Sequence, residues 1–339
     1  MLDVFLSDIS VTRGSFSLRG IALTCPATTH TAIAGPPASG KSTLLELIAG
    51  RLKPSSGDIR IGSRVVNDLR ESRRPLLFAT SELDVPQRWS VRHALVAAVH
   101  QRTLDRVDRQ HEYNLAVEKW ALERVIERDV RTLSSTERTI VHLARIELLR
   151  PGILIADRLL ERASEEVADK FYRTLRVAGT TVIGTPAHRY ELGATDRVVV
   201  LDRGRVVQEG TAAHVYANPV NRAAATATGE VNVIAIEVRH GAAESVIGSW
   251  QTSAFDGKGV ALVRPEAFSV AEPGEESDLI VGVEEASFEN GRWLVRAILT
   301  GGLILRVSLP PNLRLHKGKL LALRYDPAAF TLEPDPAAV

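Results

Sequence analysis

The stretch Gly35-Pro-Pro-Ala-Ser-Gly40-Lys41-Ser42 decides how the first part of this sequence is interpreted. It matches the phosphate-binding pattern G-x-x-x-x-G-K-[ST] at every fixed position. The glycines let backbone N–H groups turn inward around phosphate oxygens, and the helix that follows directs its positive N-terminal end at the same anion. A short apolar strand at 31–34 precedes the loop, and a helical run at 43–52 follows it. The pattern therefore predicts a nucleotide phosphate site between a strand and a helix.

We expect this site to bind ATP together with Mg²⁺. Lys41 would reach the β- and γ-phosphates, and the hydroxyl of Ser42 would ligate the metal ion. The loop and the start of the helix supply the predicted nucleotide-binding residues Gly35, Pro36, Ala38, Ser39, Gly40, Lys41, Ser42 and Thr43.

A second metal ligand is expected at the end of a neighbouring strand. In Gly152-Ile-Leu-Ile-Ala-Asp157, four apolar residues place Asp157 at the carboxyl edge of a strand, where ligands of α/β sheets collect. We predict that Asp157 holds Mg²⁺ directly or through water. The alternative interpretation is a strand-end aspartate that caps the next segment.

The order of predicted elements divides the chain into domains. Antiparallel strands occupy the first 25 residues, and short strands then alternate with helices, which predicts a mostly parallel sheet. We expect a nucleotide-binding domain at 1–217, with a helical subdomain at about 86–145, and a structureless linker at 218–230. From 231 to 335, short β-like runs broken by glycine and proline predict a small antiparallel barrel or sandwich.

Composition excludes several kinds of function. The chain of 339 residues carries 42 basic and 41 acidic residues, so its net charge of +1 gives no general attraction to nucleic acid. The single cysteine, Cys25, allows no intrachain disulfide and fits a reducing compartment. The N-terminus lacks a signal-peptide pattern, and no apolar run approaches the roughly 20 residues that span a bilayer. A membrane role would therefore need a partner.

Further segments resemble the ATP-binding subunits of ABC importers, most closely those of the maltose type. Leu133-Ser-Ser-Thr-Glu-Arg138, with the run IVHLARIELLRPGILIAD, resembles the LSGGQ helix of that family and its approach to the magnesium aspartate. THTAIAG, GRVVQEG and HVYANP also resemble family segments in their usual order. The resemblance implies an α/β P-loop NTPase fold (the ABC ATPase fold) with antiparallel β and helical subdomains. The C-terminal barrel resembles the transport-associated (TOBE) domain.

The resemblance also implies partners and a cellular location. Family members form head-to-tail dimers, in which each ATP lies between one phosphate loop and the LSGGQ helix of the other subunit; here Ser134, Ser135 and Thr136 would form that partner-site signature. We expect a second ATPase subunit, membrane permease subunits and an external solute-binding protein, with this chain peripheral at the cytoplasmic face of the membrane. Sugar import is the class that the resemblance favours, and no nucleic-acid partner is expected.

The sequence departs from the family where hydrolysis takes place. Arg158 occupies the usual position of the glutamate that polarises water, and a guanidinium cannot act as a base. Pro186 occupies the usual histidine position, and the loop that normally supplies a glutamine reads Leu77-Phe-Ala-Thr80. No catalytic residue is therefore assigned. We expect a hydrolysis-deficient subunit, the degenerate half of a heterodimeric ATPase whose other half is a different, active chain.

Two other functions remain open from the sequence alone: a slow homodimeric importer ATPase, and an ATP-dependent scaffold or switch outside transport. The role of Arg158 also has two interpretations. Its guanidinium would either tighten ATP binding by pairing with phosphate oxygens, or form a surface ion pair with a neighbouring acid such as Glu161.

Overall fold

In the computed structural model, residues 2–272 and 274–335 are described. The chain divides into two units, one ending at Val215 and the other beginning at Tyr216. Apolar side chains of the first unit form two clusters, and those of the second unit form a cluster of their own. Each unit therefore has its own core and is described by itself.

A mostly parallel sheet forms the centre of the first unit, with strand order β10-β9-β3-β8-β7-β6 over the described residues. Only its edge strand β10 runs antiparallel to its neighbour β9. The strands are β3 (His30–Ala34), β6 (Leu77–Thr80), β7 (Ile153–Asp157), β8 (Thr181–Thr185), β9 (Arg197–Asp202) and β10 (Arg205–Gly210). The predicted parallel sheet is confirmed.

The first unit also contains a smaller antiparallel sheet, with strand order β2-β1-β4-β5 in the described chain. Its strands are β1 (Val4–Arg13), β2 (Phe16–Cys25), β4 (Ser56–Ile61) and β5 (Arg64–Val65). The helices of this unit are α1 (Lys41–Ala49), α2 (Val91–Val99), α3 (Arg106–Lys119), α4 (Ser135–Leu149) and α5 (Glu165–Val177). The range predicted as helix-like, 90–149, thus contains three helices separated by turns.

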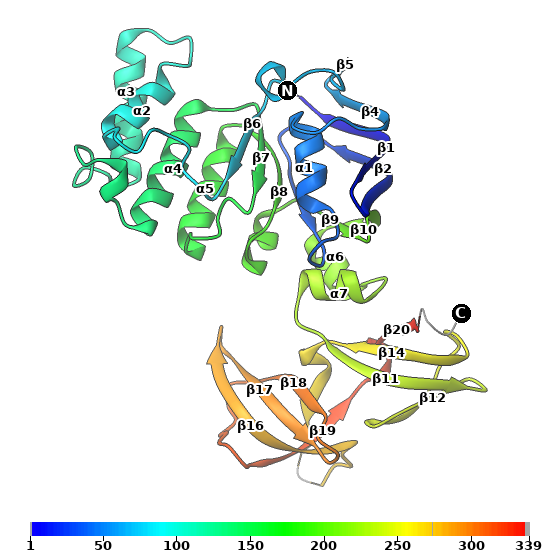
Figure 1. Cartoon of the computed structure of the whole chain (residues 1–339). Coiled ribbons are helices and arrows are strands. Elements are labelled where there is room, and N and C mark those ends of the chain that lie inside the picture. The colour runs from blue at the N-terminus through cyan, green and yellow to red at the C-terminus, as the bar shows by residue number, and fades with distance from the viewer. Residues whose placement is uncertain (1, 273, 336–339) are drawn as a thin grey trace. The chain divides into compact units, whose positions relative to one another are not determined.

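Alternation along the parallel strands builds the layers of this unit (Figure 1). In β7, Ile153 and Ile155 pack with α1 and the antiparallel sheet, whereas Leu154 and Ala156 pack with α4 and α5 on the other face. Successive side chains of a strand point to opposite faces, so a continuous apolar run is needed to fill both cores. The carboxyl ends of the strands are left as the edge where polar side chains can gather.

The segment 218–230, predicted as a structureless linker, contains the helix α7 (Arg222–Thr228), so that prediction is wrong. Asn221 begins the helix by accepting a hydrogen bond from the N–H of Ala224 at 2.9 Å. The alanine-rich sequence that follows has high helix propensity despite its lack of an apolar stripe. A shorter helix, α6 (Ala212–Ala217), precedes it.

The second unit is antiparallel throughout its described strands, and the predicted all-β region is confirmed. Its strands form two sheets, with orders β13-β12-β11-β14-β20 and β15-β19-β16-β17-β18. They are β11 (Asn232–Arg239), β12 (Ala242–Ser245), β13 (Gly248–Gln251), β14 (Gly257–Val263), β15 (Phe268–Val270), β16 (Leu279–Glu289), β17 (Arg292–Leu299), β18 (Ile304–Leu309), β19 (Leu320–Tyr325) and β20 (Thr331–Pro334). Among the described helices, none has the length and apolar character needed to cross a membrane.

Candidate nucleotide site

The phosphate loop lies between β3 and α1, and two glycines make its path possible. Gly35 has φ +141° and Gly40 has φ +106°, both outside the range that side chains readily allow. A Cβ on Gly35 would lie 2.1 Å from the carbonyl oxygen of Leu201. Gly40 precedes α1 and has no side chain to cap it, so the first N–H groups of the helix remain available to an anion.

Lys41 marks the place that phosphate oxygens would take. Its Nζ atom donates to the carbonyl oxygens of Gly35 at 2.9 Å and Pro36 at 2.7 Å. The ammonium therefore lies over the loop, within reach of any group held there. Burial lowers the pKa of Lys41, the carboxylate of Asp157 opposes this shift, and the guanidinium of Arg158 adds to it. These three charges share one site.

Three oxygen-bearing side chains line up at the carboxyl ends of neighbouring strands. Asp157 on β7 pairs in register with Thr80 on β6 and with Thr185 on β8. Register partners of adjacent strands point to the same face, and the strands are roughly 4.8 Å apart. The hydroxyl of Thr185 donates to Oδ1 of Asp157 at 2.6 Å, which orients the carboxylate. With the exposed hydroxyl of Ser42 at the start of α1, this row supplies the hard oxygen ligands that Mg²⁺ prefers.

Arg158 directly follows Asp157 in a left-handed backbone conformation, with φ +50°. The hydroxyl of Thr185 accepts a hydrogen bond from its N–H at 2.9 Å, and its guanidinium pairs with Glu161 at 2.7 Å. The Arg158 guanidinium holds the pKa of Glu161 below its usual range. The structure thus contains the ion pair of the alternative interpretation, and Glu161 is engaged by a cation.

The loop after β8 begins with Pro186, whose side chain can neither accept nor donate a proton. His188, two residues on, directs Nε2 to the carbonyl oxygen of Glu161 at 3.0 Å and stacks on Tyr190. Glu191 holds this loop from within: its Oε1 accepts from the N–H groups of Ala187 at 2.7 Å and His188 at 2.8 Å. Burial raises the pKa of Glu191 above its usual range.

The signature segment begins α4, as predicted, and its first residues are exposed. Ser134 is the N-cap, and Ser135 and Thr136 form the first turn. Glu137 closes a capping box: its carboxylate accepts from the Ser134 N–H at 2.7 Å and pairs with Arg128 at 2.9 Å. The Ser134 hydrogen bonds hold the pKa of Glu137 below its usual range, so the carboxylate stays charged and the Arg128 guanidinium offsets its charge at this helix start. Sequence reasoning missed that charge, although S-x-x-E is a recognisable capping pattern.

Comparison with known proteins identifies this arrangement. The family profile described as ABC transporter matches residues 18–160, which include the phosphate loop, the signature segment and Asp157. Residues 18–160 form an ABC transporter ATP-binding domain. ABC domains bind ATP with Mg²⁺, and the free helix start, Lys41 and the row of oxygen ligands fit both.

Relatives with import functions match nearly the whole chain around this ABC domain. A sn-glycerol-3-phosphate import ATP-binding protein of Agrobacterium fabrum is 27% identical over 315 residues, covering 88% of this chain and 88% of that protein. A sulfate/thiosulfate import ATP-binding protein of Chromobacterium violaceum is 28% identical over 322 residues, covering 90% and 87%.

Solved structures agree on the fold of the ABC domain. An ATP-binding cassette of an ABC transporter in its ADP conformation has a TM-score of 0.54 at 18% identity, covering 65% of this chain and 96% of that one. A cassette from a Clostridium perfringens transporter complex has a TM-score of 0.55 at 22% identity, covering 63% and 90%. At these identities the likeness concerns the fold alone.

The structure adds residues to the ABC domain's site that the sequence did not single out. Thr80 and Thr185 flank Asp157, and their signal was their place at the ends of short apolar strands. Phe16, half-buried at the start of β2, lies against the phosphate loop: a Cβ on Gly40 would come within 2.6 Å of its ring. Arg13, the last residue of β1, pairs with Glu46 of α1 at 2.9 Å.

Proposed function

We propose that this chain is the ATP-binding subunit of an ABC importer that binds Mg·ATP but hydrolyses it poorly. In this proposal it is the degenerate half of a heterodimeric ATPase, and a different chain supplies the active half. The observation that carries the proposal is the Arg158–Glu161 ion pair beside Asp157, next to an intact phosphate loop.

The binding half of the proposal rests on groups that contact phosphate in the ground state. Lys41, Ser42, Asp157 and the N–H groups at the start of α1 supply charge, metal ligands and hydrogen-bond donors. None of these contacts needs a base. ATP affinity is therefore expected to survive the changes elsewhere in the site.

The poor hydrolysis rests on the groups around the attacking water. In the family resemblance, a glutamate follows the magnesium aspartate and a histidine follows the late strand; here Arg158 and Pro186 stand there. Glu161, the next carboxylate after Asp157, is paired with Arg158, and His188 is turned to a backbone carbonyl. Loss of a positioned base typically slows a reaction by about a hundred- to ten-thousandfold.

A different partner chain is favoured because each shared site needs a signature helix as well as a phosphate loop. In a homodimer each phosphate loop would be this chain's own, so both shared sites would lack the water-polarising glutamate and the histidine. A different chain would supply both groups at one of the two shared sites. The chain's own phosphate loop would then be completed by the active subunit.

The proposed solute class and membrane partners are supported by the relatives and the resemblance. We propose solute uptake together with membrane permease subunits and an external solute-binding protein, at the cytoplasmic face of the membrane. Sugar is the class predicted from the resemblance, and the named relatives import a phosphorylated glycerol and sulfur oxyanions. We also propose that the second unit is the TOBE-like regulatory domain of such importers.

A gain-of-function experiment tests the hydrolysis claim. The purified chain should bind Mg·ATP, lose binding on Lys41→Ala, and release phosphate slowly. Arg158→Glu combined with Pro186→His should raise the rate of phosphate release at least tenfold. Phosphate release as fast in the unchanged chain as in the double variant contradicts the proposal, and co-purification with an identical chain alone favours the slow homodimer.

A further inference from the structure

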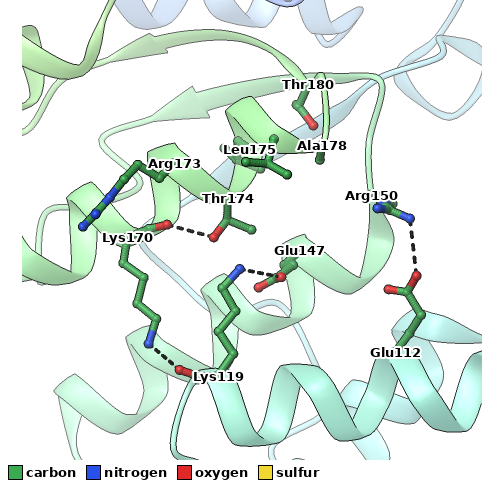
Figure 2. Close-up of a pocket in the computed structure, with 11 residues that line it drawn as sticks. Glu112, Lys119, Glu147, Arg150, Lys170, Arg173, Thr174, Leu175, Ala178 and Thr180 are labelled. Carbon is green, nitrogen blue, oxygen red and sulfur yellow. Dashed lines mark hydrogen bonds and ion pairs between the residues drawn. The ribbon is translucent and has the colours of Figure 1, made fainter.

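A cavity lies in the first unit beside Thr180, at the amino end of β8 (Figure 2). Its volume is about 420 Å³, within the range of small-molecule sites. Its wall includes Thr180, the residue before β8, whereas Thr185 beside Asp157 ends that strand, roughly 16 Å away at about 3.3 Å per residue. The cavity is therefore separate from the nucleotide site.

The cavity is lined by the C-terminal parts of α3, α4 and α5, and its charged side chains are mostly basic. Four lining residues are basic and two are acidic, an excess of two positive charges. The charged lining residues are Glu112, Lys119, Glu147, Arg150, Lys170 and Arg173. Leu175, Val177 and Ala178 add an apolar wall.

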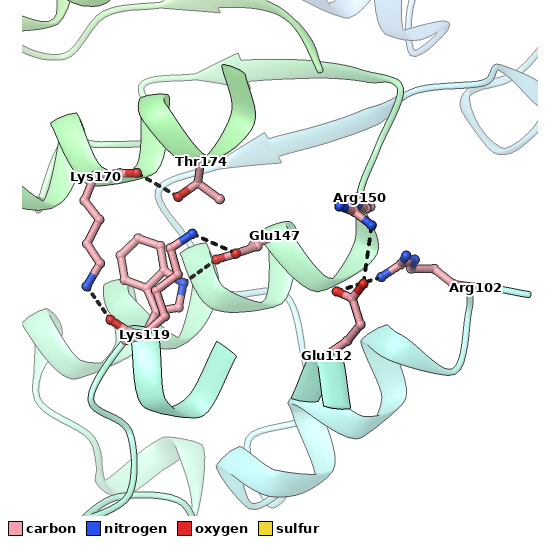
Figure 3. A network of polar contacts seen from close by, with 8 residues as sticks. Arg102, Glu112, Lys119, Glu147, Arg150, Lys170 and Thr174 are labelled. Carbon is pink, nitrogen blue, oxygen red and sulfur yellow. Dashed lines mark hydrogen bonds and ion pairs between the residues drawn. The ribbon is translucent and has the colours of Figure 1, made fainter. Parts of the chain in front are cut away.

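Both carboxylates of the lining are already held by donors (Figure 3). Glu147 accepts from Nζ of Lys119 at 2.9 Å and from Nε1 of Trp120 at 2.6 Å. Glu112 pairs with Arg102 at 3.2 Å and with Arg150 at 3.3 Å. These carboxylates are accordingly occupied as acceptors and do not call for a cationic ligand.

The basic groups, by contrast, keep donors to spare. Lys170 donates to the carbonyl oxygen of Lys119 and lies over the Trp120 ring, 5.0 Å from its centre. Arg173 is exposed and donates through Nε to the carbonyl oxygen of Asp169 at 3.3 Å. An ammonium has three N–H groups and a guanidinium has five, so these contacts leave donors that a bound anion could use.

We propose that this cavity binds a small organic anion with at least two negative charges, carried by carboxylate or phosphate groups. Arg173, Lys170 and Arg150 would hold the charged groups, and the exposed Ala178 would contact the aliphatic part. Such a ligand joins α3 and α5 across the end of α4. The signature residue Ser134 caps the N-terminal end of α4, roughly 22 Å from the cavity along the 15 residues of the helix. A ligand at the C-terminal end of α4 is therefore connected to Ser134 through a rigid helix.

Calorimetric titration of the full-length Lys41→Ala protein tests this inference. That background removes the phosphate-loop lysine, so the result does not depend on the nucleotide site or on the proposed function. Citrate and inorganic pyrophosphate are the probes, at low salt and at raised salt. We expect saturable binding of at least one probe with one site per chain, weakened by salt because charges screen one another.

Matched variants locate the binding. Arg173→Ala and Lys170→Gln should each weaken it roughly tenfold or more, since a charge-assisted hydrogen bond contributes at least that factor. Arg124→Ala, which removes an exposed arginine outside the cavity lining, should leave it within about twofold. Trp120 fluorescence, read after Trp89, Trp250 and Trp293 are changed to phenylalanine, should shift on binding. Failure of both probes to saturate, or equal affinities for Arg173→Ala and Arg124→Ala, overturns the inference.

Discussion

Replacing Gly35 with alanine should destabilise the first unit by about 2–6 kcal/mol. The new Cβ would lie 2.1 Å from the Leu201 carbonyl oxygen and 3.0 Å from Oγ of Ser39. The backbone oxygen belongs to β9, which pairs with β3, so it can move only if the sheet moves. Strain at φ +141° contributes about 1–3 kcal/mol and overpacking a further 1–3 kcal/mol.

Urea unfolding measures this cost if the two units are distinguished. With Trp250 and Trp293 changed to phenylalanine, the remaining Trp89 and Trp120 report the first unit. Gly152→Ala is the matched control: a Cβ there meets no atom of the described chain within 4 Å, so its effect should stay within about 0.5 kcal/mol. Equal free energies of unfolding for the two variants would refute the reasoning.

Three further predictions concern buried groups. Burial raises the pKa of the Cys25 thiol to about 12, so thiol reagents at pH 8 should label it only after unfolding in urea. Burial lowers the pKa of His30 and His142 to about 4, so below pH 6.5 the unfolded chain binds more protons than the folded chain. Urea titrations should therefore show the free energy of unfolding decreasing as the pH falls from 6.5 to 4, by up to about 1.4 kcal/mol per pH unit for each histidine. The Arg264 guanidinium donates to the carbonyl oxygens of Tyr216 and Ala225, each at 2.9 Å. Because Arg264→Met removes both donors, it should lower the free energy of unfolding of the second unit by about 3 kcal/mol or more, measured by scanning calorimetry.

Much of the first unit was predictable because its strands are short apolar runs bounded by clear turn signals. Gly35 and Gly40 mark a loop whose geometry few other residues allow, and Asp157 ends a run that must be buried on both faces. The linker prediction failed for a physical reason: an alanine-rich segment has no apolar stripe, yet it has high helix propensity and a capping Asn221.

The site was harder to predict where it depends on register between strands. Thr80 and Thr185 stand far from Asp157 in the sequence and meet it only because β6, β7 and β8 end in step. Likewise, Arg173 and Glu112 lie on separate helices and line one cavity. Nothing in the sequence indicates that this basic and this acidic residue share it. Local motifs are visible in a single sequence, whereas contacts set by tertiary packing are not.

Parallel measurement of Mg·ATP binding and phosphate release by the purified chain tests the central claim most directly. The account predicts saturable binding that Lys41→Ala abolishes, with phosphate release roughly tenfold or more slower than that of the Arg158→Glu, Pro186→His variant. Brisk turnover by the unchanged chain alone, or no uptake of Mg·ATP, would contradict it.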